Sequence, residues 1–301
     1  MDSFRRTWGA RVDWKKLRPM ILKRIRARSR DYPVRSMVPV AADVLKSRLL
    51  LIEGVSSLLH FVPIKSCRFC PEVSISQSGH LIKSCQGYRR SAKDQLHQWI
   101  DGQASDILIP VETFHLHNMF QDVIRHDQRF DFERVPAIVE LCTQAGVDTS
   151  GEGNGFSNDS HDKLPSDVLP GELRSIAQRT LEAWENMRMG VKRLMMVYPV
   201  KVCQYCKEVH VGPSGHKARM CGPFKYEGWR GMHFWKAASV DDLVPPKLVW
   251  HKRPQDPAVL TEAGRGFYGH APAVVELCAQ AGAAVPKKYL CMMKANGLTR
   301  T

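Results

Sequence analysis

The sequence lacks any run of 18 or more consecutive apolar residues. A helix that crosses a membrane needs about 20 predominantly apolar residues, so we expect no transmembrane helix. The longest apolar stretch, at 49–62, is interrupted by Glu53, Gly54 and two serines, and it predicts a buried helix instead. No apolar segment follows the N-terminal charges, which argues against a secretory signal and against an extracellular, disulfide-bonded protein.

Acidic residues are outnumbered in this chain, because 30 Asp and Glu stand against 44 Lys and Arg, a net charge of +14. Such a balance favours a polyanionic partner, either nucleic acid or an anionic membrane surface. The positive charge is concentrated: residues 1–30 hold eleven Lys and Arg and two Asp, whereas the stretch 148–172 is acidic. The stretch 18–31 predicts a short basic helix with Pro19 in its first turn, which either contacts nucleic acid or forms a solvated face.

Nine cysteines are present, and six of them fall in two matching clusters. The segment CRFCPEVSISQSGHLIKSC spans residues 67–85, and CQYCKEVHVGPSGHKARMC spans residues 203–221. Both have the spacing C-x2-C-x9-H-x4-C, so that residue 67 corresponds to residue 203, an offset of 136. Four potential metal ligands repeated at the same spacing are far more specific than a lone C-x2-C pair.

The offset of 136 residues also holds well beyond the cysteines. Trp99 matches Trp235, and PAIVELCTQAG at 136–146 matches PAVVELCAQAG at 272–282, with no insertion or deletion in between. The sequence therefore predicts an internal duplication. Its expected parts are a basic N-terminal segment (1–38), a first repeat (39–147, core about 65–150), a flexible acidic linker (148–172), a second repeat (173–286, core about 201–286) and a C-terminal tail (287–301).

The local patterns predict an α+β fold that is mainly helical, with short strands around a metal loop in each of two tandem zinc-finger-like repeats. Apolar residues recur at helical spacing over 40–59 and 173–194. β-Branched residues alternate in VSIS and VHV, just after the C-x2-C pairs, which favours strands. A helix with Pro in its first turn and Gly as its C-cap is expected to close each repeat, with Cys142 or Cys278 in the core.

Three Cys and one His per cluster match a common donor set of structural Zn²⁺. We therefore predict two Zn²⁺ ions, one in each repeat. Gly79 and Gly215 stand directly before the histidines and give the backbone freedom to turn there. Disulfides, reduced structural cysteines and an iron–sulfur cluster are alternatives, the last disfavoured because it usually has four cysteines. The predicted ligands are Cys67, Cys70, His80 and Cys85, then Cys203, Cys206, His216 and Cys221.

Two further histidine pairs recur at the same offset and are rival ligands, namely His97 with His233 and His115 with His251. His97 lies in LHQWI, where we expect a helix, and it either replaces the predicted histidine ligand or orients a ligand. The remaining unmatched histidines are expected at the surface, at positions 117, 126, 210 and 270. The pattern assigns no role to Cys291.

The chain resembles the APO family of plant organelle proteins, named for accumulation of photosystem one. The resemblance rests on RVDWKKLRPMILKRI at 11–25, on the duplicated C-x2-C-x9-H-x4-C spacing, on DILIPVETFHLHN at 106–118 and on the two PAxVELCxQAG endings. It extends from about Arg11 to Val285, and the chain is similar above all to the mitochondrial branch. All eight positions that carry the zinc ligands in the family's pattern are present.

What the resemblance implies is an organelle RNA-binding protein that promotes group II intron splicing or related RNA processing, with other splicing factors as candidate partners. The family is also linked to assembly of 4Fe–4S-containing complexes, which is the alternative function. The implied location is the mitochondrion or, alternatively, the chloroplast. The Arg-rich start is compatible with organelle targeting, although only about ten residues precede the family-like region, fewer than a transit peptide usually has.

Basic and aromatic residues alternate around both cysteine clusters, a pattern that favours RNA. Lys and Arg neutralise phosphates, and exposed rings such as Phe69 and Tyr205 stack on unpaired bases. The alternative is that these rings pack against the metal loops and the charges are only solvated. The expected RNA-binding residues are Lys65, Arg68, Lys83, Arg89, Arg90, Lys201, Lys207, Lys217, Arg219, Lys225 and Arg230.

The stretch FHLHN at 114–118 is similar to the His-Asn-His type of metal-dependent nuclease. The second copy reads WHKRP, which keeps His251 but lacks the second His and the Asn, and no paired carboxylates accompany either copy. We therefore expect no catalysis and no catalytic residues. A third hypothesis is a scaffold whose thiols pass on iron, which predicts labile iron in the purified protein.

Overall fold

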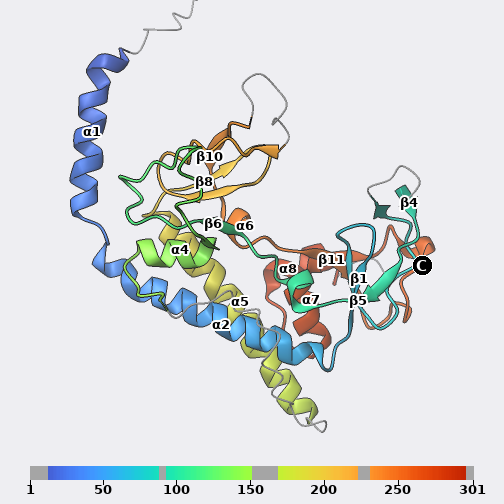
Figure 1. Ribbon diagram of the computed structural model, residues 1–301. Helices are drawn as coiled ribbons and strands as arrows, with labels where there is room; N and C mark the ends of the chain where they lie inside the picture. The colour runs from blue at the N-terminus through green and yellow to red at the C-terminus, as the bar shows by residue number, and fades with distance from the viewer. Residues whose placement is uncertain (1–12, 88–92, 151–168, 223–230, 296–301) are drawn as a thin grey trace, which may run out of the picture.

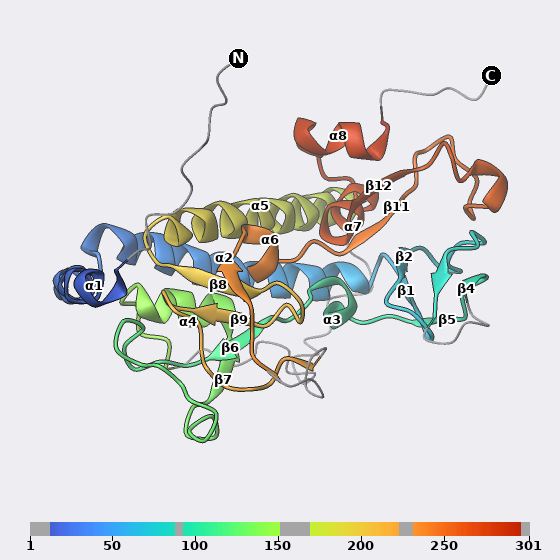
Figure 2. The same cartoon turned by 90° about the horizontal axis from the view of Figure 1, so that it is seen from above.

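The computed structural model describes residues 13–87, 93–150, 169–222 and 231–295. In these ranges it combines helices with short strands, as the sequence predicts, and no helix there is long and apolar enough to cross a membrane. Two long helices, α2 (Val38–Leu59) and α5 (Pro170–Met195), run side by side through the middle of the molecule (Figures 1 and 2). Both were expected from the spacing of their apolar residues.

The contact between α2 and α5 is the centre of the hydrophobic core. Each helix carries a stripe of apolar residues on the side that faces the other, and burial of such a stripe is the main source of helix stability in a folded protein. The fully buried side chains of this contact include Leu51, Val55 and Leu58 from α2 and Leu181, Val191 and Leu194 from α5.

Two glycines allow α2 and α5 to approach closely. A Cβ atom on Gly54 would lie 2.0 Å from Thr180 Oγ1, and a Cβ atom on Gly190 would lie 2.3 Å from Val44 Cγ2. The two contacts are equivalent, since Gly54 corresponds to Gly190 and Val44 corresponds to Thr180 at the offset of 136. In each contact, a glycine of one repeat meets the same position of the other repeat. The helices are therefore antiparallel and related by an approximate two-fold axis.

A three-stranded antiparallel sheet follows each long helix. The first has the order β2-β1-β5, from β1 (Ile64–Cys67), β2 (Val73–Ile75) and β5 (Trp99–Asp101), and the second has the order β10-β8-β9, from β8 (Val200–Cys203), β9 (Val209–Val211) and β10 (Trp235–Ala237). The strands expected in VSIS and VHV are confirmed as β2 and β9. The helix expected at LHQWI is wrong, because this segment leads into β5, which pairs with β1.

The second half of each repeat is a short helix, a two-stranded hairpin and a closing helix. In the first repeat these are α3 (Ala104–Ile107), β6 (Glu112–Phe114), β7 (Arg134–Pro136) and α4 (Ala137–Gln144). In the second they are α6 (Val240–Leu243), β11 (Leu248–His251), β12 (Gly269–Pro272) and α7 (Ala273–Gln280). The C-caps of the closing helices are Ala145 and Ala281, and the glycines expected as C-caps, Gly146 and Gly282, follow them by one residue with φ of 94° and 91°.

The remaining short elements lie at the edges of these units. A small hairpin joins β3 (Cys85–Gln86) to β4 (Lys93–Gln95), and the 3-10 helices η1 (Arg35–Met37) and η4 (Glu262–Gly264) lie before α2 and between β11 and β12. The expected C-terminal tail includes a helix, α8 (Lys287–Met293). The expected linker lies largely outside the described residues, and α5 already begins at Pro170, inside its predicted end.

The closing hairpin and helix of each repeat pack against the sheet of the other repeat. Strand β6 and helix α4 lie beside β9, whereas strand β11 and helix α7 lie beside β2. The backbone N–H of Lys217 donates to the carbonyl of Ile124 at 2.7 Å, and that of Leu81 donates to the carbonyl of Leu260 at 2.8 Å. These two hydrogen bonds also correspond at the offset of 136. The closing half of each repeat thus packs on the sheet of the other repeat, across the approximate two-fold axis. The two sheets lie toward opposite ends of the α2–α5 pair (Figure 1).

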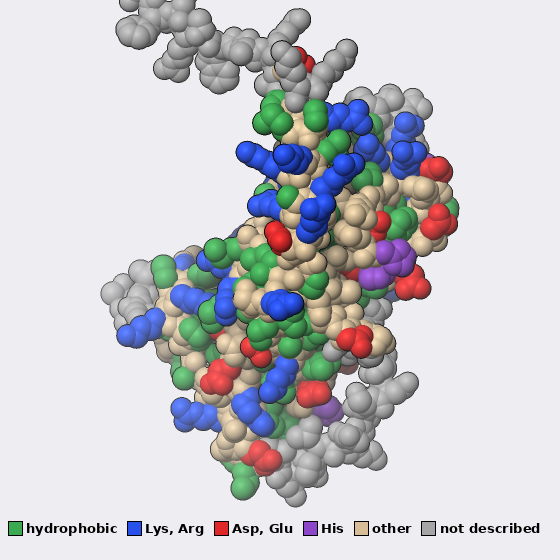
Figure 3. Space-filling model, turned by 90° about the vertical axis from the view of Figure 1, so that its left-hand side faces the viewer, with side chains coloured by type: hydrophobic (Ala, Val, Ile, Leu, Met, Phe, Trp, Pro, Cys, Tyr) green, Lys and Arg blue, Asp and Glu red, His purple; other side chains and the backbone are tan. Residues whose placement is uncertain are grey.

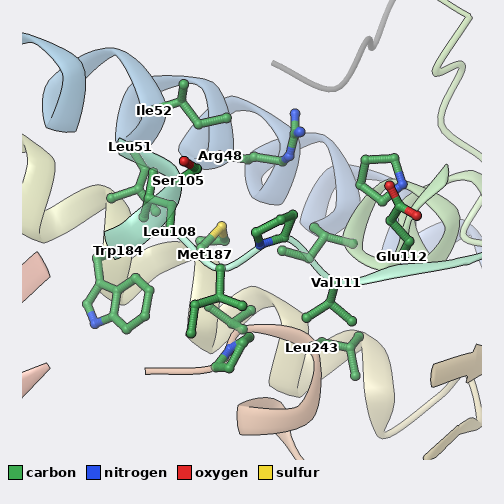
Figure 4. Close-up of a pocket in the computed structure, with 16 residues that line it drawn as sticks. Arg48, Leu51, Ile52, Ser105, Leu108, Val111, Glu112, Trp184, Met187 and Leu243 are labelled. Carbon is green, nitrogen blue, oxygen red and sulfur yellow. The ribbon is translucent and has the colours of Figure 1, made fainter. Parts of the chain in front are cut away.

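An apolar cavity of about 360 Å³ lies near this axis, between α2, α5 and the segments that follow α3 and α6 (Figure 4). Its lining again contains residues that correspond in the two repeats, Leu51 with Met187 and Leu108 with Val244. The cavity is therefore a product of the duplication, formed where the two halves meet.

Helix α1 (Trp14–Arg30) projects from the body at one end of α2 (Figure 1). The basic helix predicted there is confirmed, but it begins at Trp14, so Pro19 lies inside it rather than in its first turn. Eight of its residues are Lys or Arg and none is acidic. Met20, Ile21 and Leu22 are exposed together with the described basic side chains, so this helix is not part of the core.

Candidate metal centres

The three cysteines of the first cluster come from three separate backbone segments. Cys67 ends β1, Cys70 follows after a tight turn, and Cys85 begins β3. Within the turn, the backbone N–H of Phe69 donates to Cys67 Sγ at 3.4 Å. His97 lies just before β5, and the pairing of Cys67 with Trp99 across β1 and β5 places it beside the sulfur atoms.

The first centre groups Cys67, Cys70, Cys85 and His97, whose ligand atoms all lie within 4.8 Å of one another. Cys67 Sγ and Cys85 Sγ are 4.0 Å apart, and Cys70 Sγ is 3.4 Å from His97 Nδ1. With Zn–S bonds of about 2.3 Å and a Zn–N bond of about 2.0 Å, the edges of a tetrahedron measure about 3.8 Å between sulfurs and about 3.5 Å between sulfur and nitrogen. The observed spacing fits a four-coordinate ion of this size.

The second centre repeats this arrangement with Cys203, Cys206, Cys221 and His233. Here Cys203 Sγ and Cys221 Sγ are 3.9 Å apart, and Cys206 Sγ is 3.2 Å from His233 Nδ1. A disulfide needs sulfurs about 2.05 Å apart. All six cysteines are therefore free thiols in an arrangement that fits a metal ion and not a disulfide.

The predicted ligands His80 and His216 are not in these four-residue groups. His80 Nδ1 accepts the backbone N–H of Ile82 at 3.2 Å, and its Nε2 lies 3.0 Å from Glu72. His216 Nδ1 likewise accepts the backbone N–H of Ala218 at 3.2 Å. Both rings thus stabilise the turn that carries the last cysteine. His80 can still share an ion with Glu72 and His97, which form a separate potential group in the first repeat.

The turn before each of these histidines requires glycine. Gly79 and Gly215 have φ of 78° and 71°, a region that side chains with a Cβ atom rarely adopt. A Cβ atom on Gly79 would also lie 2.3 Å from Trp99 Nε1. That indole nitrogen donates to the carbonyl of His80 at 3.0 Å, and Trp235 does the same for His216. The two tryptophans therefore hold the loops over the metal centres.

Burial and hydrogen bonds shift the pKa values of the cysteine thiols in opposite directions within each centre. Burial raises the pKa of Cys67, but hydrogen bonds from Phe69 and His97 outweigh this effect and bring it to about 7. Burial raises the pKa of Cys70 to about 12. The second centre is alike, since burial raises the pKa of Cys206 to about 12. A bound divalent cation would compensate three thiolates and so favour the ligand form of all of them.

A carboxylate orients the histidine of the first centre. His97 Nε2 lies 3.2 Å from Glu72 Oε2, which leaves Nδ1 directed toward the sulfurs. Burial raises the pKa of Glu72, but the hydrogen bonds from His80 and His97 outweigh it and hold this pKa far below its usual range. Carboxylate–histidine pairs of this kind are typical of metal sites. In the second centre, His233 Nε2 is buried and has no hydrogen-bond partner among the described residues.

The other rival pair, His115 and His251, lies away from the cysteines and serves the closing helices. His115 Nδ1 is 2.7 Å from Glu140, and His251 Nδ1 is 2.5 Å from Glu276, both fully buried carboxylates. The carboxylate Glu140 Oε1 also accepts from the backbone N–H of Leu116 at 3.0 Å. These contacts fasten each hairpin to its closing helix.

The nuclease-like stretch lines a pocket with His115, His117 and Asn118, and its polar groups make contacts within the fold. His117 is exposed, and the side chain of Asn118 accepts the backbone N–H of Phe120 at 3.0 Å within its own turn. Two carboxylates contact this stretch: Glu140 is buried and accepts several hydrogen bonds, and Asp122 accepts the backbone N–H of Asn118 at 2.7 Å. His115 therefore links its hairpin to the closing helix through Glu140.

The structure confirms most of the remaining predictions for Cys and His residues and contradicts one of them. Cys142 and Cys278 are fully buried in the core, as expected. Three of the four unmatched histidines are exposed as predicted, at positions 117, 126 and 270. His210 is the exception and the prediction for it is wrong: it is 2% exposed, because it alternates inward on β9 and packs against His216 and Trp235. Burial lowers its pKa to about 3.

The structure describes seven of the eleven expected RNA-binding residues, and five of these seven are exposed. Lys65 is partly buried and pairs with Asp101 at 2.5 Å, and Lys201 is partly buried on β8. Four residues lie outside the described ranges, at positions 89, 90, 225 and 230. The exposed ones are Arg68, Lys83, Lys207, Lys217 and Arg219.

Comparison with known families agrees with the two tandem units. A family described as APO RNA-binding matches residues 3–152 and again residues 163–298, nearly the whole chain. The chain belongs to the APO family. No solved structure matches it. The predicted resemblance is thereby confirmed, and the family supplies the description of each unit as an RNA-binding domain.

Three APO proteins of Arabidopsis thaliana are similar to this chain over most of its length. APO protein 2, chloroplastic, is 40% identical over 87% of this chain and 67% of its own length. APO protein 1, chloroplastic, is 37% identical over 95% of this chain and 74% of its own length. APO protein 3, mitochondrial, is 38% identical over 87% of this chain and 73% of its own length. These identities do not separate the chloroplast from the mitochondrial relatives.

Proposed function

We propose that this APO protein is a non-catalytic RNA-binding protein with one Zn²⁺ ion in each of its two cysteine–histidine centres. The proposed ligands are the three cysteines of each cluster together with His97 in the first centre and His233 in the second. Three thiolates and one imidazole are a closed donor set that leaves no coordination position for water or substrate. The bound ion would therefore supply structural stability rather than chemistry.

The observation that carries RNA binding is a pair of exposed rings at equivalent positions beside the two centres. Phe69 and Tyr205 occupy the turns of the two C-x2-C pairs, and each is 45% exposed. Each turn also carries an exposed cation: Arg68 directly precedes Phe69, and Lys207 lies two positions after Tyr205. A ring on a rigid turn offers an unpaired base a surface for stacking, while the cations contact the phosphates.

Helix α1 supports the same function with a long-range electrostatic attraction. Figure 3, which views the molecule from the side of α1, shows Lys and Arg side chains gathered along this projecting helix. The exposed cations of α1 are Arg18, Lys23, Arg24, Arg26, Arg28 and Arg30. A row of cations on a helix that itself contains no acidic residue attracts a phosphate chain and accelerates its association.

We extend the proposal to the process in which the RNA is bound. The family resemblance supports group II intron splicing or related RNA processing in an organelle, the mitochondrion or alternatively the chloroplast. The names of the relatives supply both locations. RNA that copurifies with the protein from each organelle, identified by sequencing, tests both points: enrichment of intron sequences is expected, and an absence of introns would contradict the splicing role.

Binding of the zinc-loaded full chain to single-stranded RNA tests the RNA function. Removal of both rings, in a Phe69→Ala and Tyr205→Ala variant, is expected to weaken binding by about 1–3 kcal/mol per ring. Phe130→Ala is the matched control, because Phe130 is an exposed ring in the β6–β7 loop. Duplex RNA, whose bases are already stacked, should bind both proteins alike. Failure of the unaltered chain to bind any RNA at low salt would contradict the proposal.

A further inference from the structure

The first metal centre is contacted by a side chain from the second repeat. Trp250 Nε1, on β11, donates a hydrogen bond of 2.9 Å to Glu72 Oε1. Glu72 is the carboxylate that also meets His97 Nε2 at 3.2 Å, and it accepts from the hydroxyl of Ser84. The indole of Trp250 further packs edge-on against His80, with 6.2 Å between ring centroids. The residue that fixes the orienting carboxylate thus lies 178 positions away in the sequence.

The second metal centre receives the matching contact from the first repeat. Phe114, the residue equivalent to Trp250, packs edge-on against His216 with 5.1 Å between ring centroids. Arg134 on β7 lies over the Phe114 ring at 4.7 Å and forms an ion pair with Glu208, the residue equivalent to Glu72. In both centres, therefore, the ring at this position packs against the histidine of the other repeat's metal loop, and the carboxylate beside that loop is contacted by Trp250 in the first centre and by Arg134 in the second.

We propose that each metal centre is completed by the opposite repeat, with Trp250 and Arg134 as the positioning residues that act through Glu72 and Glu208. This inference rests on the proposed metal centres and adds that neither repeat forms its centre unaided. The closing hairpin of one repeat holds the carboxylate of the other. In the first centre this carboxylate contacts His97 directly, and in the second Glu208 lies 3.7 Å from His216 Nε2, in the turn that carries the last cysteine.

The mechanism of this coupling follows from the hydrogen bonds of Glu72. A carboxylate that accepts from His97 Nε2–H keeps Nδ1 free for an ion. The indole N–H of Trp250 occupies another lone pair of the same carboxylate and so limits its rotation. Without that donor the carboxylate can turn away, and the imidazole loses its preferred orientation. Outer partners of metal ligands typically contribute about 10- to 100-fold in metal affinity.

A substitution in each repeat tests whether its effect appears in the other repeat. Trp250→Phe removes the indole N–H while keeping a ring, and phenylalanine is the residue that the first repeat has at this position. Arg134→Gln removes the ion pair with Glu208. Trp184→Phe is the control, since its Nε1 donates to the hydroxyl of Tyr289 at 3.3 Å and that contact lies away from both centres.

The readout is the alkylation rate of individual cysteines in the zinc-loaded full chain, challenged with a chelator and mapped by mass spectrometry. Trp250→Phe is expected to accelerate alkylation of Cys67, Cys70 and Cys85 by about 10- to 100-fold and to leave the second cluster unchanged. Arg134→Gln is expected to accelerate alkylation of Cys203, Cys206 and Cys221 only. Cys142 and Cys278 report general unfolding, because both are fully buried in the core and react only when the core opens.

Each outcome of this experiment decides the proposal. The proposal is overturned if a substitution accelerates alkylation only in the cluster of its own repeat, or if neither variant accelerates it. Either result leaves the two proposed zinc centres standing. If Trp250→Phe also exposes the core cysteines, Arg134→Gln gives the decision alone. The double variant Trp250→Phe, Glu72→Gln must alkylate its first cluster little faster than the stronger single variant, since Trp250 acts through Glu72. An unaltered chain without bound metal overturns the proposed centres and this inference together.

Discussion

The choice of histidine in the first centre can be tested by a pair of substitutions seventeen residues apart. His97→Ala removes the imidazole that lies 3.4 Å from Cys70 Sγ, whereas His80→Ala removes the imidazole that only supports the neighbouring turn. The sequence pattern alone favoured His80. The geometry therefore predicts that His97 is the ligand, whereas the sequence spacing predicts His80.

The expected loss can be scaled from the affinity of structural zinc. Such sites contribute about 10–16 kcal/mol of binding free energy in small zinc-finger peptides, so one of four ligands accounts for roughly 3 kcal/mol. That corresponds to roughly a 100-fold weaker Kd. His80→Ala should cost less, because it removes a hydrogen bond to the backbone of Ile82 and one contact with Glu72 but no ligand atom of the four-residue group.

Competition with a chromophoric chelator measures both variants, with the metal-to-chain ratio determined by elemental analysis. The unaltered chain is expected to hold two ions, His97→Ala to release one at a chelator concentration about 100-fold lower, and His80→Ala to resemble the unaltered chain more closely. His233→Ala and His216→Ala repeat the comparison in the second centre. Cobalt substitution adds a spectroscopic check, because the visible bands report the donor set.

The refuting result is a reversal of the two variants. If His80→Ala releases the ion and His97→Ala keeps it, the ion is bound by the ligands that the sequence spacing predicted, and the loop between Cys85 and His97 must take a different path. Equal and large losses in both variants would instead indicate that Glu72, His80 and His97 share the ion.

Three further predictions concern stability and RNA binding. Gly79→Ala should lower the free energy of unfolding by more than about 1 kcal/mol in urea titrations, because it combines a φ of 78° with a contact to Trp99, whereas Gly171→Ala, with open space around it, should not; equal effects would contradict this reading of the turn. His210 has a folded-state pKa of about 3, below an unfolded value of about 6.5, so its contribution to stability is complete above pH 6.5 and is lost as pH falls. The unaltered chain should lose about 1.4 kcal/mol more than His210→Ser between pH 7.5 and 5.5, and an identical loss in both would refute the burial argument. Replacement of Arg24, Arg26, Arg28 and Arg30 by Gln should reduce the salt dependence of RNA binding by about 0.7 log units per lost phosphate contact. The control replaces Arg174, Arg179, Lys192 and Arg193, exposed cations on α5, and an equal effect there would show that only net charge matters.

The sequence could predict those features that depend on neighbouring residues. The apolar spacing over 40–59 gave α2, and the β-branched VHV gave β9, because these patterns act within one turn or one strand pair. Gly79 could be recognised because a positive φ is a local requirement. Cys142 could be placed in the core because it falls on the apolar stripe of a short helix.

The ligand histidine could not be chosen from spacing. His80 and His97 recur equally in both repeats, and the choice depends on how β5 pairs with β1, which places His97 beside Cys70. The recurrence of His97 was the only signal in the sequence. His210 was misplaced for a similar reason, since its burial depends on which face of β9 meets the rest of the fold.

The exchange of the two halves is hidden from the sequence by the duplication itself. A hairpin that fits the sheet of its own repeat fits the equivalent sheet of the other repeat almost equally well, so the pattern of apolar residues cannot distinguish the two pairings. What distinguishes them is geometry: α2 and α5 approach through Gly54 and Gly190 in an antiparallel pair, and this pair directs each sheet toward the hairpin of the other repeat. The small differences between the copies follow from this arrangement. Trp250 donates a hydrogen bond to Glu72. Its counterpart Phe114 has no such donor, and Arg134 forms an ion pair with Glu208 instead. The two centres have thus diverged in how the opposite repeat holds them, while their cysteines and histidines have remained the same.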